Sequence, residues 1–320
     1  MILFTADWHI KLGQKNVPAS WALNRYRMFF QQVSALEPKC DLHIIGGDLF
    51  DRLPKMEELE LYFDFVRSVT IPTIIYDGNH EATKKSKTFF TQLKAVTSHL
   101  NPLVRVVDSS YIDLEYGFGI LPYTDLHKKD IFDYFRGVDI LFTHVRGEIP
   151  PHVKPEIDLE LLKDYRYVFA GDLHSHSNTQ GNLIYPGSPM TTSFHRNEVS
   201  TGYLLIDDKN DYNWSWHEFQ LLQLMRKTVS SPDEMVGTDY HHTIYEVEGD
   251  IQELSGVKNS ELLDKKVVKR SSEATLVINP DMSIGEELRE YLLYILELPA
   301  DSVDSTLRTF HDYASKVEME

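Results

Sequence analysis

The first 77 residues alternate short, continuously apolar runs with longer amphipathic stretches, and this alternation limits the folds open to the chain. The strand-like runs and the helical patterns between them lie at 2–6, 21–36, 42–47, 55–69 and 72–77. Four apolar residues of the second helical pattern recur at the spacing of one buried face: Leu59, Tyr62, Phe63 and Val66. Because the strand-like runs are apolar at successive positions, both faces of their sheet must be covered. The pattern predicts an α/β fold.

The middle of the chain contains more strand-like runs and few helical ones. Five short runs separated by turn residues lie at 118–123, 139–145, 165–174, 182–188 and 202–208. We therefore expect two packed sheets, a β-sandwich core flanked by helices, in a domain that spans residues 1–220.

Two further segments follow this domain. Residues 221–282 are more polar and predict a small α/β capping domain, with strands at 242–250 and 273–280 and a helix at 259–269. Residues 283–320 carry two helical patterns. In the second pattern, apolar residues at spacings of 4, 3, 4 and 3 form a heptad seam, which consists of Val303, Leu307, Phe310, Ala314 and Val317.

Charge and cysteine content exclude several classes of protein. The chain has 32 Lys+Arg against 49 Asp+Glu, a formal net charge of −17, so a nucleic acid must be met at a local basic patch or through metal ions. Cys40 is the single cysteine and cannot form an internal disulfide. No apolar run is long enough to span a bilayer, and the N-terminus lacks the basic region and cleavage site of a signal peptide. We expect a cytoplasmic protein that does not enter a membrane.

Several of the 14 histidines stand beside Asp, Asn or Gly where a strand pattern ends. Five motifs share this placement: Asp7-Trp8-His9, Gly47-Asp48-Leu49-Phe50-Asp51, Gly78-Asn79-His80-Glu81, Thr143-His144 and Gly171-Asp172-Leu173-His174-Ser175-His176. Each motif alone is typical of a turn or a helix cap. Side chains at the carboxyl ends of strands in an α/β sheet converge on one crevice, so together the motifs predict a single site.

The donor types in these motifs point to divalent metal ions. Carboxylate, imidazole and amide donors suit borderline-hard ions, and the absence of thiolates argues against a structural zinc site. Alternate side chains of Asp7-Trp8-His9 lie on one side of an extended strand end, so both can reach one ion. We expect glycines at 46, 47, 78 and 171 to permit the turns that aim such side chains inward.

The order of these motifs resembles that of the calcineurin-like metallophosphoesterases. The motifs occur in the same order as in the family signature. That order is Asp-x-His, Gly-Asp-x-x-Asp, Gly-Asn-His-Glu, a lone Thr-His, and a Gly-x-x-His element followed by Tyr185-Pro186-Gly187. Within the superfamily the chain looks like the SbcD type of double-strand-break-repair nuclease and is similar to phage recombination endonuclease subunits. The resemblance covers about residues 1–220 and implies a dinuclear metal centre.

Carried over by motif position, the resemblance assigns a role to each metal-site residue. It implies two divalent ions, Mn²⁺ first, with Mg²⁺, Fe²⁺ and Zn²⁺ as alternatives. It implies that Asp7 and His9 bind one ion, that Asp48 bridges both, and that Asn79 and His144 bind the second. His80 is implied to be the catalytic histidine that is not a ligand.

The last motif departs from the family pattern, which is Gly-His-x-His. Counting from Gly171 to Tyr185 without a gap gives His174 the place of the second histidine, and Asp172 replaces the first. A slip of two residues would instead use His174 and His176. We prefer Asp172, because a carboxylate is an acceptable ligand and the slip requires a bulge.

Such a constellation can hydrolyse phosphoesters. Two cations held by a bridging carboxylate clamp a phosphate, lower the pKa of a shared water and stabilise both the attacking and the leaving oxygens. His80 would stabilise the charge that develops or protonate the leaving oxygen. Asp51 either orients His80 or is a turn carboxylate at a helix start; the sequence leaves both open.

Substrate and partners rest on weaker patterns. Two clusters of basic residues can follow a phosphate backbone or form solvated surfaces: Lys84, Lys85 and Lys87, and Lys265, Lys266, Lys269 and Arg270. The resemblance implies that the C-terminal helices dock on an SbcC-type coiled-coil ATPase, although the same seam can pack within its own domain. It also implies homodimerisation through an early helix such as 21–36.

Together these observations predict a DNA nuclease subunit. The resemblance implies 3′-to-5′ exonuclease action on duplex DNA and endonuclease action on single strands or hairpins, in repair or recombination with a partner ATPase, in the host cytoplasm if the chain is phage-encoded. The chain has no Walker A pattern, so ATP binding must come from another chain. Two other functions stay open, namely a phosphodiesterase acting on small or protein substrates and an inactive scaffold that binds DNA or the ATPase.

Overall fold

The computed structural model describes residues 1–84, 87–151, 153–229, 234–235, 241–248, 263–268, 283–295 and 300–317. The chain divides into two compact units, Met1–Val247 with Leu254–Lys266, and Glu248–Glu253 with Val267–Glu320. The first unit contains the six- and five-stranded sheets and most of a three-stranded sheet. The described part of the second contains the last residues of two strands of that sheet and the C-terminal helices. The predicted domain limits at 220 and 282 stay predictions.

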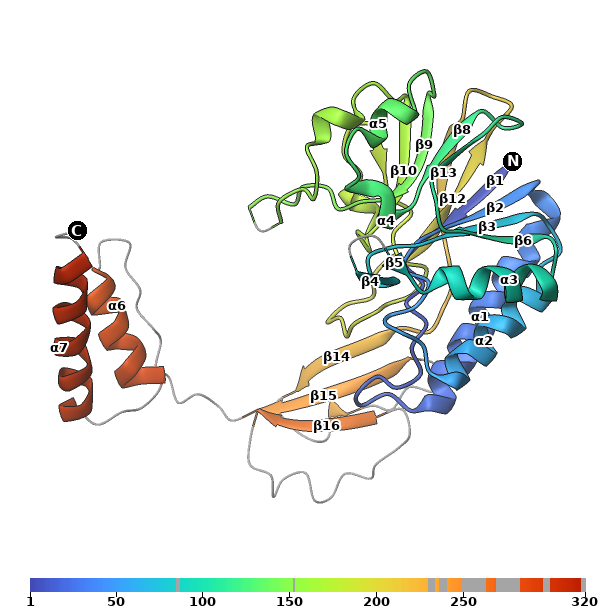
Figure 1. Cartoon of the computed structure of the whole chain (residues 1–320). Coiled ribbons are helices and arrows are strands. Elements are labelled where there is room, and N and C mark those ends of the chain that lie inside the picture. Colours follow the sequence, from blue (N-terminus) through green and yellow to red (C-terminus); the bar gives the residue numbers. More distant parts are fainter. Residues whose placement is uncertain are drawn as a thin grey trace. The chain divides into compact units, whose positions relative to one another are not determined.

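A six-stranded sheet forms one layer of the first unit (Figure 1). Its order is β13 (Asn213–Glu218), β12 (Gly202–Asp207), β1 (Ile2–Thr5), β2 (Leu42–Gly46), β3 (Thr73–Tyr76) and β6 (Val104–Val107). The strands from β1 to β6 in this order run parallel, whereas β12 is antiparallel to both of its neighbours. This parallel order follows from the helices that connect β1, β2, β3 and β6.

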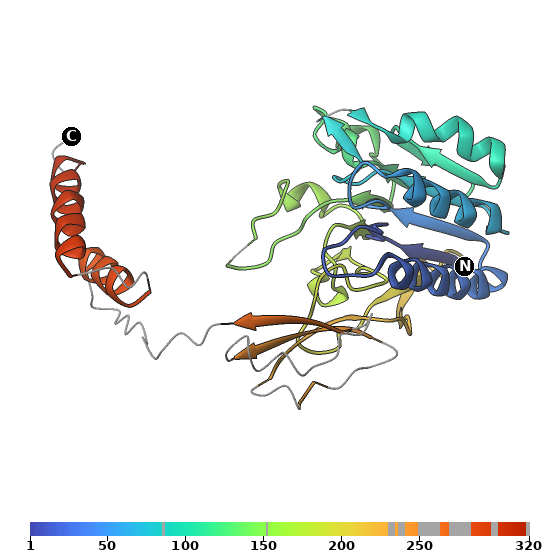
Figure 2. The same ribbon diagram turned by 90° about the horizontal axis from the view of Figure 1, so that it is seen from below.

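Three helices cover the outer face of this sheet, as the blue to teal ribbons in Figures 1 and 2 show. They are α1 (Ala19–Leu36), α2 (Met56–Ser68) and α3 (Phe90–Leu100). Their apolar faces meet the sheet in one cluster in which Trp8, Phe29 and Phe65 are packed edge to face. The helices expected at 21–36 and 55–69 are confirmed.

A five-stranded sheet forms the other layer. Its order is β11 (Leu183–Ile184), β10 (Tyr167–Gly171), β9 (Ile140–His144), β8 (Phe118–Leu121) and β7 (Tyr111–Asp113), and only the β7–β8 pair is antiparallel. Along the chain, short helical segments lie between its strands: α4 (Tyr123–Leu126), α5 (Ile131–Tyr134), η2 (Leu159–Leu162) and η3 (His176–Asn178). Smaller elements elsewhere are η1 (Glu37–Lys39) and the hairpin of β4 (Ala82–Lys84) and β5 (Lys87–Thr88).

The two sheets pack face to face through a core of buried apolar side chains. Phe4 of β1 meets Phe142 of β9 with ring centroids 5.3 Å apart, and Phe169 of β10 stacks on Phe142 at 5.2 Å. A third cluster, which includes Phe135 and Leu162, covers the far face of the five-stranded sheet. The predicted α/β fold of two packed sheets with outer helices is therefore confirmed.

A three-stranded sheet follows, with the order β14 (Leu224–Val229), β15 (His242–Glu248) and β16 (Leu263–Val268). The strand expected at 242–250 is confirmed, but the helix expected at 259–269 is wrong, because residues 263–268 form β16. Pairing in this sheet overrides the weak helical spacing, and the β-branched pair Val267 and Val268 favours a strand. The strand expected at 273–280 lies outside the described residues.

The second unit contains α6 (Ile284–Glu290), a π-helical turn η6 (Tyr291–Ile295) and α7 (Ala300–Val317). Both predicted C-terminal helices are therefore present. Val303 and Leu307 of the heptad seam are buried against Leu292, so these two side chains form the core of the helix pair itself. Phe310 is half-buried, and Ala314 and Val317 belong to the same helix. None of the helices in the described ranges is long and apolar enough to cross a membrane.

Candidate metal centre

The five sequence motifs meet where β1, β2, β3, β9 and β10 end. The backbone bends sharply at these ends, since Asp7, His9, Asp48 and Asp172 have φ values of 57°, 45°, 49° and 103°. Residues other than glycine rarely adopt such positive φ angles, and strained backbone of this kind clusters at functional sites. Four of the residues expected to bind metal thus share an unusual conformation that turns their side chains into one space.

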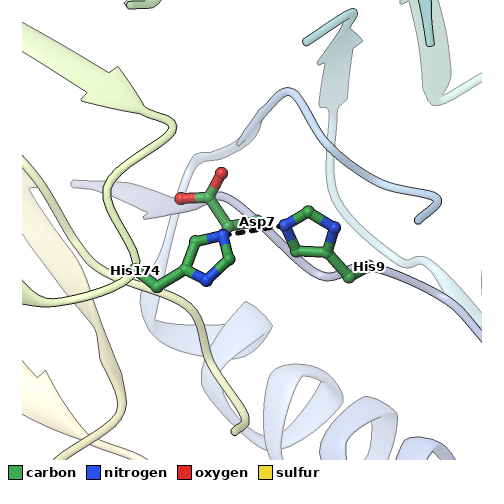
Figure 3. A group of neighbouring side chains, drawn as sticks. All are labelled: Asp7, His9 and His174. Carbon is green, nitrogen blue, oxygen red and sulfur yellow. Dashed lines mark hydrogen bonds between the residues drawn. The ribbon is translucent and has the colours of Figure 1, made fainter. Parts of the chain in front are cut away.

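Asp7, His9 and His174 form the first group of donor atoms (Figure 3). Nε2 of His9 lies 2.9 Å from Nε2 of His174. On the far side of the His174 ring, Nδ1 is 3.0 Å from Oγ1 of Thr192. A hydroxyl partner for Nδ1 leaves Nε2 directed at the group, as is usual for histidines that bind metal.

Asp48, Asn79 and His144 lie on the other side of the centre. Nε2 of His144 is 3.1 Å from Oδ1 of Asn79 and 3.5 Å from Oδ1 of Asp48. Nδ1 of His144 donates to the Gly46 carbonyl at 2.9 Å, which fixes the ring with Nε2 toward the centre. Asp172 also faces this ring, with its Oδ1 3.8 Å from Nε2 of His144.

The carboxylate of Asp48 lies between the two groups. Its Oδ2 is 3.6 Å from Nε2 of His9, and its Oδ1 faces His144. The side chain is almost completely buried. One carboxylate that presents an oxygen to each side has the placement that a bridging ligand requires.

The buried carboxylates of this centre create an environment that favours cations. Burial raises the pKa of Asp7 to about 8, and burial lowers the pKa of His9 to about 3. Although burial opposes a charge on His144, the carboxylates of Asp48, Asp7 and Asp172 raise its pKa well above the usual range. Burial thus opposes the negative charge of Asp7, while the carboxylates around His144 favour a positive charge beside them.

The residues fit divalent metal ions on this evidence. Oδ2 of Asp7 is buried without a hydrogen-bond partner among the described residues. In each of three overlapping groups of residues, the donor atoms lie within 4.8 Å of one another. Buried carboxylates without partners are costly unless a cation neutralises them. The mixture of carboxylate, imidazole and amide donors suits Mn²⁺, Fe²⁺ or Zn²⁺.

His80 lies at the open side of the centre and is about one-third exposed. Its Nδ1 donates to the main-chain carbonyl of Asp51 at 2.5 Å, and its backbone N–H donates to Oδ1 of Asp48 at 3.0 Å. Its Nε2 is 3.8 Å from Oδ2 of Asp48. The Asp51 carboxylate does not hold His80; instead, it pairs with Lys11 at 2.7 Å.

His176, the alternative to Asp172, points elsewhere. Its Nδ1 bonds to the Tyr185 carbonyl at 2.7 Å, and its ring stacks on Trp216 with centroids 5.4 Å apart. It belongs to none of the donor groups found in the described residues.

Two supporting residues were not singled out by sequence reasoning. Glu81 is completely buried and accepts hydrogen bonds from the backbone N–H groups of Asp48, Phe50 and Gly78 at 2.8–3.0 Å, which ties the loop after β2 to the loop after β3. Its place in the Gly-Asn-His-Glu motif was a usable signal. Thr192, in contrast, belongs to none of the motifs, and no sequence signal indicated its role.

Glycines near the centre act chiefly by leaving room. A Cβ on Gly78 would lie 2.2 Å from Oδ1 of Asp48, so any larger residue would displace that carboxylate. Gly47, with φ of +85°, is the one position among the four expected that has the turn conformation glycine favours.

The basic residues expected to contact DNA are spread over two places. Lys84 and Lys87 pair across the β4–β5 hairpin, and Lys265 and Lys266 lie in β16. Lys85, Lys269 and Arg270 lie outside the described residues.

Comparison with known proteins identifies the family. The calcineurin-like phosphoesterase model matches residues 1–199. The chain is 39% identical over 316 residues to "Probable exonuclease subunit 1" of Escherichia phage T5, an alignment that covers 96% of each chain. The chain belongs to the calcineurin-like phosphoesterases.

Solved structures give weaker likenesses to this phosphoesterase. An archaeal phosphodiesterase aligns with a TM-score of 0.38 and 13% identity, over 68% of this chain and 99% of its own. A protein of Thermus thermophilus aligns with a TM-score of 0.41 and 14% identity, over 68% and 97%. Family membership makes the protein a hydrolytic phosphoesterase of a family that uses divalent metals, and its donor groups are of the matching type.

Proposed function

We propose that this phosphoesterase is the nuclease subunit of a DNA-processing complex and hydrolyses DNA phosphodiester bonds with two divalent metal ions, Mn²⁺ first. The observation that carries the proposal is the pair of donor groups that share Asp48. The exonuclease subunit of phage T5, similar along nearly the whole chain, supports DNA as the substrate.

Each ion would have four protein ligands in this proposal. Asp7, His9, His174 and Asp48 would hold the first ion, and Asp48, Asn79, His144 and Asp172 the second. When bound, the two ions would neutralise the phosphate and lower the pKa of a water positioned to attack it. Asp172 takes the second place in preference to His176 because it faces His144.

His80 would act on the leaving oxygen. Its Nδ1–H is engaged by the Asp51 carbonyl, so the Nε2 edge is the one directed toward the centre. A protonated imidazole there can donate its Nε2 proton to the 3′ oxygen as the P–O bond breaks. Asp51 would position His80 through its main chain.

Partners complete the proposal. The chain would act with an SbcC-type ATPase, which supplies the nucleotide-binding site, and would form a homodimer. The helix pair α6–α7 would dock the ATPase through its outer surface, because Val303 and Leu307 already pack against Leu292. The T5 relative is named as a subunit, which supports an assembly of more than one chain.

Degradation of end-labelled duplex and single-stranded DNA in Mn²⁺ tests the function. We expect cleavage by the wild type, with the 3′ end lost first on duplex DNA, and none after chelation. Hydrolysis of bis(p-nitrophenyl) phosphate by the same preparation reports on the metal centre independently of DNA. A wild type that hydrolyses the small diester but leaves DNA intact, alone and with the ATPase, would show that DNA is not the substrate.

A further inference from the structure

A groove on the three-stranded sheet gathers cationic side chains that no sequence motif indicated. It has a volume of about 470 Å³ and is lined by β14, β15 and the loop after β11; its cations are Arg196, Arg226 and Lys227. On a chain with a net charge of −17, three cations around one depression are a marked local reversal of sign.

The exposed cations of the groove are available to a ligand. Arg196 and Lys227 are exposed, and neither forms an ion pair with another residue in the described part of the chain. Arg226 lies 3.8 Å from the largely buried carboxylate of Glu246, and Glu234 also lines the groove. Tyr245 lies beneath the groove and is only 2% exposed, so the exposed surface of the groove is dominated by its cations. Cations along a groove can hold a nucleic-acid backbone without reading its sequence.

The groove is joined to the metal centre by one short segment, residues 191–196. Thr192 bonds to Nδ1 of His174, and the N–H of His195 donates to the Leu224 carbonyl at 3.0 Å. The N–H of Arg226 in turn donates to the His195 carbonyl at 2.8 Å, which sets Arg196 next to β14.

A second cavity lies along the same segment. It has a volume of about 380 Å³, and Asp172 and His174 of the metal centre line it together with Thr192, Ser193 and His195. Its other polar walls are mostly hydroxyl groups, which can bond to phosphate and sugar oxygens. His195 lines the cavity and Arg196 lines the groove, so both spaces lie along the same short segment of the chain.

We propose that Arg196, Arg226 and Lys227 form a phosphate-binding groove that holds the backbone of the DNA strand whose scissile phosphate lies at the metal centre. This inference rests on the proposed nuclease function. The strand passes from the metal centre through the hydroxyl-lined cavity and leaves over β14. Its contacts are to phosphates and carry no base specificity.

The test is DNA binding as a function of salt for the full chain. The variant Arg196→Gln/Lys227→Gln removes both exposed cations, and Arg226 is left in place because it contacts Glu246. The matched control is Lys129→Gln/Lys163→Gln, which removes two lysines that are 92% and 66% exposed on a different part of the same unit. Each protein is titrated with a fluorescent single strand in Ca²⁺, and hydrolysis of bis(p-nitrophenyl) phosphate is measured in Mn²⁺.

The expected result follows from counterion release. Each lost phosphate contact with a single strand weakens binding about fourfold at 0.15 M salt, so the groove variant binds about 15-fold more weakly and its log–log salt slope falls by about 1.4. The control keeps the wild-type affinity, and all three proteins hydrolyse the small diester equally. A groove variant that keeps wild-type affinity and slope overturns this inference alone. A wild type that binds no DNA overturns the nuclease proposal together with it.

Discussion

Replacing His80 by glutamine tests which of two roles this residue has, that of a proton donor or that of a metal ligand. The ring lies close enough to the centre for either role, since Nε2 is 3.8 Å from Oδ2 of Asp48 and His80 forms a possible donor group with His9 and Asp48. We assign it the proton-donor role, because the Asp51 carbonyl holds the ring at the open edge of the centre, where His80 is 37% exposed.

The size of the effect follows from that assignment. General acid catalysis contributes about 10²–10⁴-fold, which corresponds to roughly 3–5 kcal/mol of barrier at 1.36 kcal/mol for each factor of ten. Glutamine can keep a hydrogen bond to the Asp51 carbonyl but cannot deliver a proton. We therefore expect kcat for a diester with a poor leaving group to fall about 10²–10⁴-fold, while the Mn²⁺ dissociation constants stay within a factor of two.

The assay compares two leaving groups and one binding measurement. A diester whose leaving group is p-nitrophenolate needs little protonation, so His80→Gln should reduce its hydrolysis far less than that of DNA. Calorimetric titration with Mn²⁺ gives the affinities, and His99→Gln on the exposed surface of α3 is the control. Loss of Mn²⁺ affinity in His80→Gln, or an equal loss with both leaving groups, would refute the proton-donor role.

Three other perturbations have outcomes that the geometry sets. Thr192→Val removes the hydroxyl partner of His174 Nδ1 and should weaken Mn²⁺ binding about 10–100-fold, with recovery in Thr192→Ser; unchanged affinity would contradict the positioning role. Asp51→Ala keeps the carbonyl that holds His80 and should lower kcat less than tenfold, whereas a loss as large as that of His80→Gln would mean that the carboxylate takes part. Burial lowers the pKa of His43 to about 3, below its unfolded value near 6.5, so the unfolded state binds more protons and acid destabilises the fold. His43 alone should lower the free energy of unfolding, measured in urea, by about 2 kcal/mol between pH 7 and pH 5. The variant His43→Gln should lose this part of the pH dependence, whereas His99→Gln should keep it.

Sequence patterns were most informative for features that only one physical requirement explains, such as continuous burial of a strand. Continuously apolar runs indicated the buried parallel strands, and polar residues at their carboxyl ends indicated which side chains meet. The count from Gly171 placed Asp172 in the motif, and the structure places that carboxylate facing His144.

The sequence was less informative where tertiary contacts decide. Residues 263–268 have helical spacing as well as strand composition, and pairing in the three-stranded sheet determines the outcome. The link between Asp51 and His80 uses a main-chain carbonyl, which every residue possesses, so no pattern of side chains could indicate it. Thr192 and the groove around Arg196 depend on how the loop after β11 packs against β14, and residues so placed have no fixed spacing from the motifs.

Anomalous diffraction from crystals soaked in Mn²⁺ tests the central claim most directly. The account predicts two manganese peaks on either side of the Asp48 carboxylate, one bounded by Asp7, His9 and His174 and the other by Asn79, His144 and Asp172. A single peak, or a second ion held by His176 or His80 in place of Asp172, would contradict the dinuclear centre described here.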